Sequence, residues 1–291
     1  MKVFAESDRT DFAIHRIVNA VKKYAPSGVE FIKTEENADL VILYVYGHRR
    51  HIKYHVDRTI EKGKKLAIIQ LCIRGTPNPK TEDWIPIWEK VELVWSYYNL
   101  PKLCKEDGNA ANFNFYYAPL GVDLEVFKET KSKRKFIIAG TGSGNWFSNE
   151  CKNEVIAAAN SLGKNIFQLG NGKNSKTIIY SNGMDDKKLS KYYSRCEFVS
   201  GLHRVEGFEL PVIEGLLCGA RPICFDRPHY RHWFDGLAEF VPEDESVSEN
   251  IQKLFLKGAR AVSDQEKKYV KAHFDWKIVT DGFWKRLKEN V

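Results

Sequence analysis

Short apolar runs with strand character alternate with amphipathic helical segments along the chain. In the first third, strands are expected at residues 1–6, 38–46 and 65–73, and helices at 12–24 and 52–62. This alternation predicts parallel sheets covered by helices. The 291 residues exceed the roughly 250 at which one core usually divides, so two doubly wound α/β domains are expected. Ligands of such sheets bind at the carboxyl ends of the strands.

The distribution of charged and apolar residues predicts a soluble protein. The first ten residues carry charges where a signal peptide needs an apolar run, and no stretch approaches the roughly 18 apolar residues of a membrane helix. A cytoplasmic location is expected, and peripheral contact with a membrane stays open. The net charge of +7 is a moderate excess that would suit a nucleic acid, an anionic lipid or an acidic glycan.

The six cysteines are scattered without metal-ligand or disulfide spacing. We expect them to be reduced and buried as small hydrophobic side chains. The sequence therefore indicates no metal site.

One helix start is marked clearly in the second half of the chain. Pro211 suits the first turn of a helix because it lacks the amide donor that would be unpaired there, so a helix is expected from about Leu210. Gly219 would end it, and residues 222–225 read as a short buried strand. Amide groups at residues 208–210 would face an anion, where the helix dipole favours negative charge.

Two glutamates flank this helix start. Glu206 lies just before it and Glu214 lies one turn inside, eight positions further along. In isolation both would be interpreted as solvated acids. The glycine, proline and helix context instead favours a pair that holds a sugar and the ribose of a nucleotide.

The segment resembles the signature of retaining nucleotide-sugar glycosyltransferases with the GT-B fold, the class called glycosyl transferases group 1. That signature is Glu-Gly-Phe-Gly-Leu-Pro, then a second glutamate at this distance, then a small residue and Gly-x-Pro-Val. This chain has Glu-Gly-Phe-Glu-Leu-Pro at 206–211, Glu214, and Cys-Gly-Ala-Arg-Pro-Ile at 218–223. Glu209 replaces the usual glycine, and its carboxylate would crowd a diphosphate unless it points away.

Two further passages extend the resemblance over about residues 115–285. Residues 117–127 are similar to the family's Pro-x-Gly-Val-Asp passage into its second domain, and residues 274–276 to the aromatic-polar-Trp element before its last helix. The resemblance implies two Rossmann-like domains that face a cleft, with a reduced N-terminal domain. The expected boundaries are 1–121 for an acceptor domain, 122–275 for a donor domain, and 276–291 for a helix that crosses back.

The resemblance also implies the donor-binding residues. Glu206 and Lys152 are the expected catalytic residues, with Lys152 and helix amides on the diphosphate and Glu214 on the ribose. The remaining donor-binding candidates are Gly140, Thr141, Gly142, Ser143, Met184, Gly207, Phe208, Glu209 and Leu210. Thr141 stands where the family has a phosphate-binding arginine, so half of that positive clamp is missing. Arg9, Arg204 or Arg74 is a candidate replacement.

Acceptor binding is assigned to polar residues after the first-domain strands. The candidates are Arg9, His48, Arg50 and Arg74, and the basic and aromatic run at 47–55 is equally consistent with a solvated helix start. The aromatic run at 227–234 is interpreted as packing against the last helix, with an interdomain contact or an acceptor platform as the alternatives.

These residues imply transfer of a sugar from a UDP- or GDP-sugar to a glycan, lipid or nucleic acid, with retention and without an obligatory metal or other cofactor. Two alternatives stay open. One is a sugar transferase acting on a hydroxylated base in DNA, and the other is a non-catalytic module that binds nucleic acid or glycan on a degenerate form of the fold.

Overall fold

The computed structural model describes residues 1–6, 12–45, 49–71, 81–141, 151–204 and 207–290. The chain forms two compact units. Unit 1 comprises Met1–Gly121 and Trp276–Val291, and unit 2 comprises Val122–Asp275.

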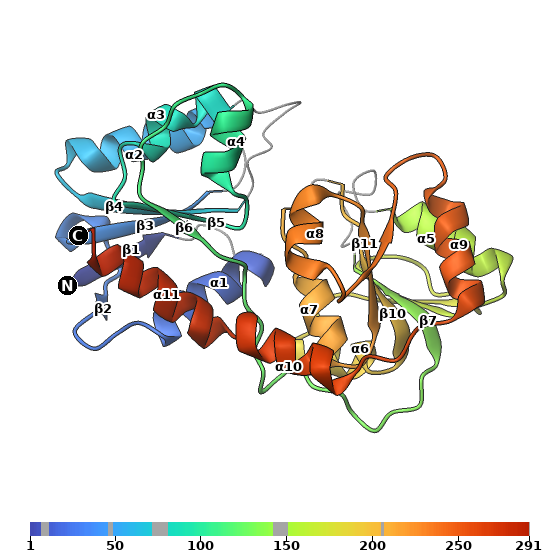
Figure 1. The fold of residues 1–291 in the computed structure, drawn as a ribbon. Coiled ribbons are helices and arrows are strands. Elements are labelled where there is room, and N and C mark those ends of the chain that lie inside the picture. Colours follow the sequence, from blue (N-terminus) through green and yellow to red (C-terminus); the bar gives the residue numbers. More distant parts are fainter. Residues whose placement is uncertain (7–11, 46–48, 72–80, 142–150, 205–206, 291) are drawn as a thin grey trace. The chain divides into compact units, whose positions relative to one another are not determined.

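Unit 1 is built on a six-stranded parallel sheet in the order β2-β1-β3-β4-β5-β6. Its strands are β1 (Lys2–Glu6), β2 (Glu30–Phe31), β3 (Leu40–Val45), β4 (Lys65–Gln70), β5 (Leu93–Ser96) and β6 (Phe115–Tyr117). Its helices are α1 (Phe12–Lys23), α2 (Arg49–Glu61), α3 (Ile85–Trp88), α4 (Leu100–Glu106) and α11 (Trp276–Lys288), with short 3-10 turns η1 (Glu35–Asn37) and η2 (Thr81–Asp83). Figure 1 shows α2, α3 and α4 on one face of the sheet and α1 and α11 on the other.

The last helix is an integral part of unit 1. The indole Nε1 of Trp284 donates to the Val21 carbonyl at 3.1 Å, and Phe283 packs on Trp95 with ring centroids 5.3 Å apart. Tyr116 on β6 donates its hydroxyl to the Val279 carbonyl at 2.9 Å. Residues more than 150 positions apart therefore close one core.

Unit 2 repeats the architecture, with strand order β12-β11-β10-β7-β8-β9 and all neighbours parallel. Its strands are β7 (Phe136–Gly140), β8 (Ile166–Leu169), β9 (Ile178–Ser181), β10 (Cys196–Gly201), β11 (Arg221–Phe225) and β12 (Glu239–Val241). Its helices are α5 (Lys152–Ser161), α6 (Asp186–Tyr193), α7 (Leu210–Leu217), α8 (Pro228–Phe234), α9 (Val247–Lys257) and α10 (Asp264–His273). In Figure 1, α5 and α9 cover one face of this sheet, and α6 and α7 cover the other.

The parallel α/β architecture expected from the alternating pattern is confirmed. The predicted helix from Leu210 is α7, with Pro211 in its first turn. Gly219 follows at φ 86°, a conformation that glycine adopts without strain. Asp185 caps α6 by accepting from the Lys188 amide at 2.7 Å. The five cysteines in the described part of the chain are free and buried, also as predicted.

Gly215 lets α7 approach β10 closely. A methyl group at this position would overlap the Val199 side chain on that strand. We expect Gly215→Ala to lower the free energy of unfolding by about 1–3 kcal/mol, because overpacking outweighs the ~1 kcal/mol that alanine contributes to a helix. Urea denaturation should show this loss, and a smaller loss when Val199→Ala is present. An increase in stability would contradict this close packing.

No helix among the described residues combines the length and the apolar character that spanning a membrane requires.

Candidate functional site

The N-terminus of α7 lies at the carboxyl edge of the unit 2 sheet. β10 ends at Gly201 and β7, its direct neighbour, ends at Gly140. Thr141, which follows β7, and residues 202–204, which follow β10, therefore lie at this edge of the sheet. This is the edge at which open parallel sheets bind ligands.

Several predicted site residues lie outside the described part of the chain. They are Glu206, Gly142 and Ser143 in unit 2, and Arg9, His48 and Arg74 in unit 1.

Glu209 is buried. Its carboxylate precedes α7 and is 1% exposed, where it accepts from the Tyr230 hydroxyl at 2.9 Å. Its other oxygen lies 2.7 Å from Nδ1 of His203. The carboxylate that departs from the family signature is thus held inside unit 2 by two side chains.

Thr141, at the end of β7, joins the same cluster. Its hydroxyl donates to the Ser200 carbonyl at 2.6 Å and lies 3.5 Å from Nε2 of His203. Sequence reasoning missed His203 and Tyr230. The only available signal was Glu209 itself, because an acid at a buried position needs hydrogen-bonding partners.

Gly140 is explained by packing. A side chain there would overlap Gln168 on the adjacent strand β8. At the start of α7, Gly207, Phe208 and Leu210 are buried. The Phe208 ring packs against Phe234 at 5.1 Å between centroids.

Lys152 and Met184 lie on the other side of the sheet centre, near β9. Lys152 is the first residue of α5, and its ammonium lies 4.8 Å from the ring centroid of Tyr180 on β9. Met184 is half-buried in the turn between β9 and α6. The cysteine before Lys152, Cys151, has a left-handed backbone with φ 34°, a strained position that the sequence did not reveal.

Glu214 is only 2% exposed. It is not the solvated helix acid that an isolated glutamate would suggest. It stands one helical turn before Cys218, whose pKa is raised to about 12 chiefly by burial, with the Glu214 charge contributing. The Cys218 thiol lies 3.4 Å from the Ser190 hydroxyl on α6.

The nearby arginines are engaged with acids. Arg204 donates to Glu154 at 2.7 Å, and Arg227 binds Glu243 through two nitrogens, each 2.7 Å from a carboxylate oxygen. Arg204 therefore has an anionic partner within unit 2 already.

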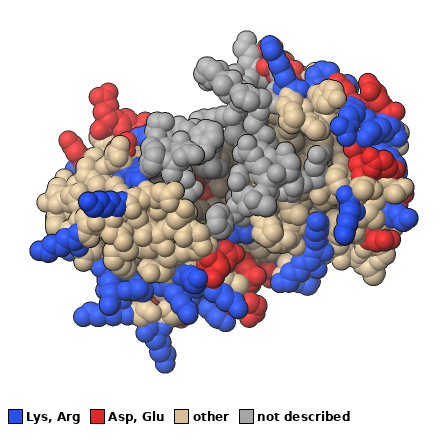
Figure 2. All heavy atoms as spheres, turned by 180° about the vertical axis from the view of Figure 1, so that it is seen from behind, with Lys and Arg blue, Asp and Glu red and all other residues tan. Residues whose placement is uncertain are grey.

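The basic run after β3 forms much of α2. Arg50 is exposed in its first turn, while a lysine and an arginine further along the helix, and a lysine just after its end, make ion pairs. These pairs are Lys53 with Asp57, Arg58 with Glu35 and Lys62 with Glu35. Figure 2 likewise shows acidic side chains among the basic ones on the described surface. An ion-paired surface of this kind is typical of a solvated helix face.

Part of the aromatic run at 227–234 is buried within unit 2. Tyr230 and Phe234 on α8 are fully buried, and Phe234 stacks on Phe274, two residues before the last helix, at 6.4 Å between centroids.

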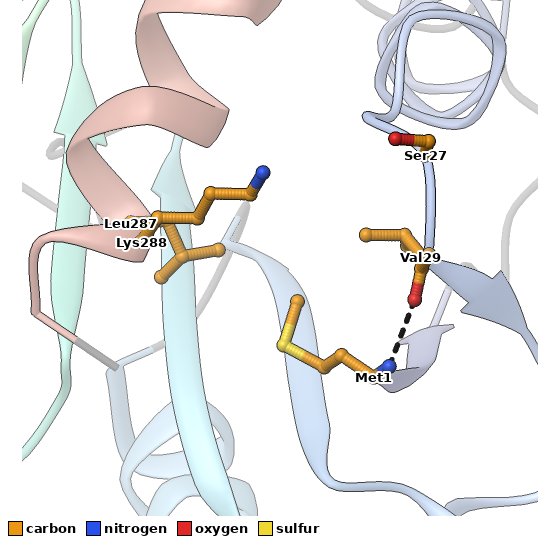
Figure 3. A pocket seen from close by; sticks show the side chains of 6 residues that line it. Met1, Ser27, Val29, Leu287 and Lys288 are labelled. Carbon is orange, nitrogen blue, oxygen red and sulfur yellow. Dashed lines mark hydrogen bonds between the residues drawn. The ribbon is translucent and has the colours of Figure 1, made fainter.

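A small apolar pocket of about 240 Å³ lies in unit 1, between residues 27–29, Met1 and residues 287–288. In Figure 3 the Met1 amino group donates to the Gly28 carbonyl, at 2.8 Å. The pocket lies at the amino ends of β1 and β2, opposite to the edge where such sheets bind ligands. Among the described residues, His, Cys, Asp and Glu side chains form no group of three or more that could hold a metal ion.

Known structures share this fold. The chain matches sucrose-phosphate synthase from Thermosynechococcus elongatus with a TM-score of 0.76 at 10% identity, over 99% of this chain and 98% of that one. HepE from Anabaena, solved in complex with UDP-glucose, gives a TM-score of 0.75 at 11% identity over 99% of both chains. The pneumococcal O-GlcNAc transferase GtfA, solved with UDP and GlcNAc, gives 0.65 at 15% identity over 94% of this chain and 59% of its own.

No protein-family model matches the sequence, and no curated protein does. At these low identities the structural likeness establishes the architecture. The chain has the GT-B fold that its signature segment implied.

Proposed function

We propose that the protein is a retaining glycosyltransferase that moves a sugar from a nucleotide-diphosphate sugar to an acceptor. The observation that carries this proposal is α7. It begins inside the Glu-Gly-Phe-Glu-Leu-Pro segment, with Pro211 in its first turn, at the ligand-binding edge of the unit 2 sheet. The same fold occurs in a protein solved with UDP-glucose, which supports a UDP- or GDP-sugar as donor.

In this proposal unit 2 binds the donor. The α7 amides and Lys152 bind the diphosphate, and Glu214 accepts hydrogen bonds from the ribose. Glu206 holds hydroxyls of the transferred sugar and stabilises the positive charge that develops at its anomeric carbon. The leaving phosphate accepts the acceptor's proton, so transfer with retention needs neither a protein nucleophile nor a metal ion.

Unit 1 orients the acceptor through Arg9, His48, Arg50 and Arg74. The acceptor class is a glycan, a lipid or a nucleic acid. The main rival is a non-catalytic binding module, which two departures from the signature favour: the arginine missing at Thr141, and Glu209. Glu209 is only weak support for the binding module, because its carboxylate is buried against Tyr230 and His203.

Donor hydrolysis tests the proposal. We expect the purified protein to release nucleoside diphosphate slowly from at least one UDP- or GDP-sugar, with water as acceptor, at a rate that EDTA leaves unchanged. Mass spectrometry would measure the release against protein-free samples. NMR would show whether the freed sugar first appears in the donor's anomeric configuration.

The alternatives give different results. Calorimetric binding of a nucleotide sugar without turnover would favour the binding module. Neither binding nor release across UDP-, GDP- and ADP-sugars would overturn the proposal.

A further inference from the structure

Glu209, His203 and Thr141 form a chain of contacts that the signature does not explain. It starts at the buried carboxylate before α7, passes through the imidazole of His203, and ends at the residue that follows β7. The Tyr230 hydroxyl donates a hydrogen bond to the other oxygen of the Glu209 carboxylate. Because an isolated buried carboxylate is costly, a cationic partner is the arrangement that best stabilises Glu209.

The contacts of the two ring nitrogens favour a positive charge on that partner. Thr141 has one hydroxyl proton and donates it to the Ser200 carbonyl at 2.6 Å, so toward Nε2 of His203 its oxygen is an acceptor. Nδ1 faces the Glu209 carboxylate, which also accepts. Both ring nitrogens therefore face acceptors, and the doubly protonated imidazolium satisfies them both.

The ring lies at the anion-favouring edge of unit 2. His203 follows β10 and touches the end of β7, the two central neighbouring strands, close to the N-terminus of α7. The His203 side chain is 12% exposed, whereas its carboxylate partner is 1% exposed. The imidazolium is thus the member of the pair that a ligand reaches.

Two other cations lie near this edge, and each already has a contact of its own. Arg204 binds Glu154, and Lys152 lies against Tyr180 near β9. The Nε2 contact with Thr141, at 3.5 Å, is long and readily exchanged for a stronger acceptor.

We propose that His203 binds the diphosphate of the donor through Nε2, as an imidazolium oriented by Glu209. The inference rests on the proposed function and assigns the positive charge that Thr141 does not provide. A charge-assisted hydrogen bond at this position would strengthen as negative charge grows on the leaving phosphate.

Nucleotide binding tests this assignment. UDP and GDP are titrated by calorimetry into the wild type, His203→Gln, and the double variant His203→Gln with Thr141→Arg. We expect His203→Gln to bind the better diphosphate at least tenfold more weakly, because one charge-assisted contact is lost. The arginine should restore most of the affinity, because it places a cation beside the same ring position. Thermal denaturation verifies that each variant is folded.

NMR titration with uridine and guanosine separates a phosphate contact from a structural role. The proposal requires nucleoside binding to be the same in wild type and His203→Gln. Equal weakening of nucleoside and diphosphate, or failure of the arginine to rescue, would overturn the role of His203. Unchanged diphosphate affinity in His203→Gln would overturn it and leave the proposed function standing. A wild type that binds neither diphosphate would overturn both.

Discussion

Arg221→Met is expected to lower the free energy of unfolding of unit 2 by about 3–5 kcal/mol. The guanidinium is fully buried and donates to both Glu266 oxygens, at 2.8 and 3.2 Å. It also donates to the carbonyl groups of Leu237, Ala261 and Arg260. Methionine fills much of the volume but leaves these acceptors without their donor. Urea denaturation followed by circular dichroism measures the loss.

Arg260→Met provides a matched control. Arg260 contacts the same Glu266 carboxylate at 2.8 Å, but its side chain is 58% exposed. An exposed pair contributes about 0–1 kcal/mol, so this variant should remain close to the wild type. Equal losses for the two arginines would mean that burial of Arg221 does not determine its contribution.

The same cluster predicts an acid-dependent loss of stability. Burial alone would raise the pKa of Glu266, but hydrogen bonds from Arg221, Ser263 and Arg260 lower it to about 2. A carboxylate with a lowered folded-state pKa stabilises the protein fully above its ordinary pKa of 4.5. This contribution, about 3 kcal/mol, should disappear as the pH falls from 4.5 toward 2. Glu266→Gln should therefore flatten the pH dependence of stability in that window, and an unchanged slope would contradict the assignment.

Glu206→Gln is expected to slow nucleoside diphosphate release by about a hundredfold to a thousandfold, with UDP or GDP affinity nearly unchanged. The reason is that the proposed role of this carboxylate is to stabilise charge that exists mainly in the transition state, and loss of one such group typically costs this much in rate. Single-turnover assays with a saturating donor sugar measure the chemical step directly.

Glu245→Gln is the control, because Glu245 is an exposed acid of the same unit. It should turn over like the wild type. If Glu206→Gln retains full activity, the carboxylate does not act at the anomeric carbon, and the catalytic assignment must move to another residue.

The sequence predicted those features that depend on neighbouring residues. Pro211 and Gly219 mark the two ends of α7, and alternating apolar runs indicate the parallel strands, because both signals act within a few positions. Several boundaries differ by a few residues: the helix expected at 52–62 begins at Arg49, and the strand expected at 65–73 ends at Gln70.

Features made by distant residues were not predictable in the same way. Arg221 reads as an ordinary polar residue before a strand, and only its burial against Glu266, 45 positions away, reveals its role. Glu209 was recognised as a departure from the signature. Its hydrogen-bond partner Tyr230 was not predictable, because it lies 21 positions away on α8 and reaches Glu209 only in the folded unit.

The position of α11 has a consequence for synthesis of the protein on the ribosome. Unit 2 is one uninterrupted segment, whereas unit 1 requires Trp284 on α11 to reach Val21 on α1 before its second sheet face is fully covered. Residues 1–121 must therefore wait for residues 276–291, whereas unit 2 has all of its parts once residue 275 has been made. During this interval the incomplete sheet exposes apolar surface. Nascent chains should consequently be targets for chaperones until α11 has been made.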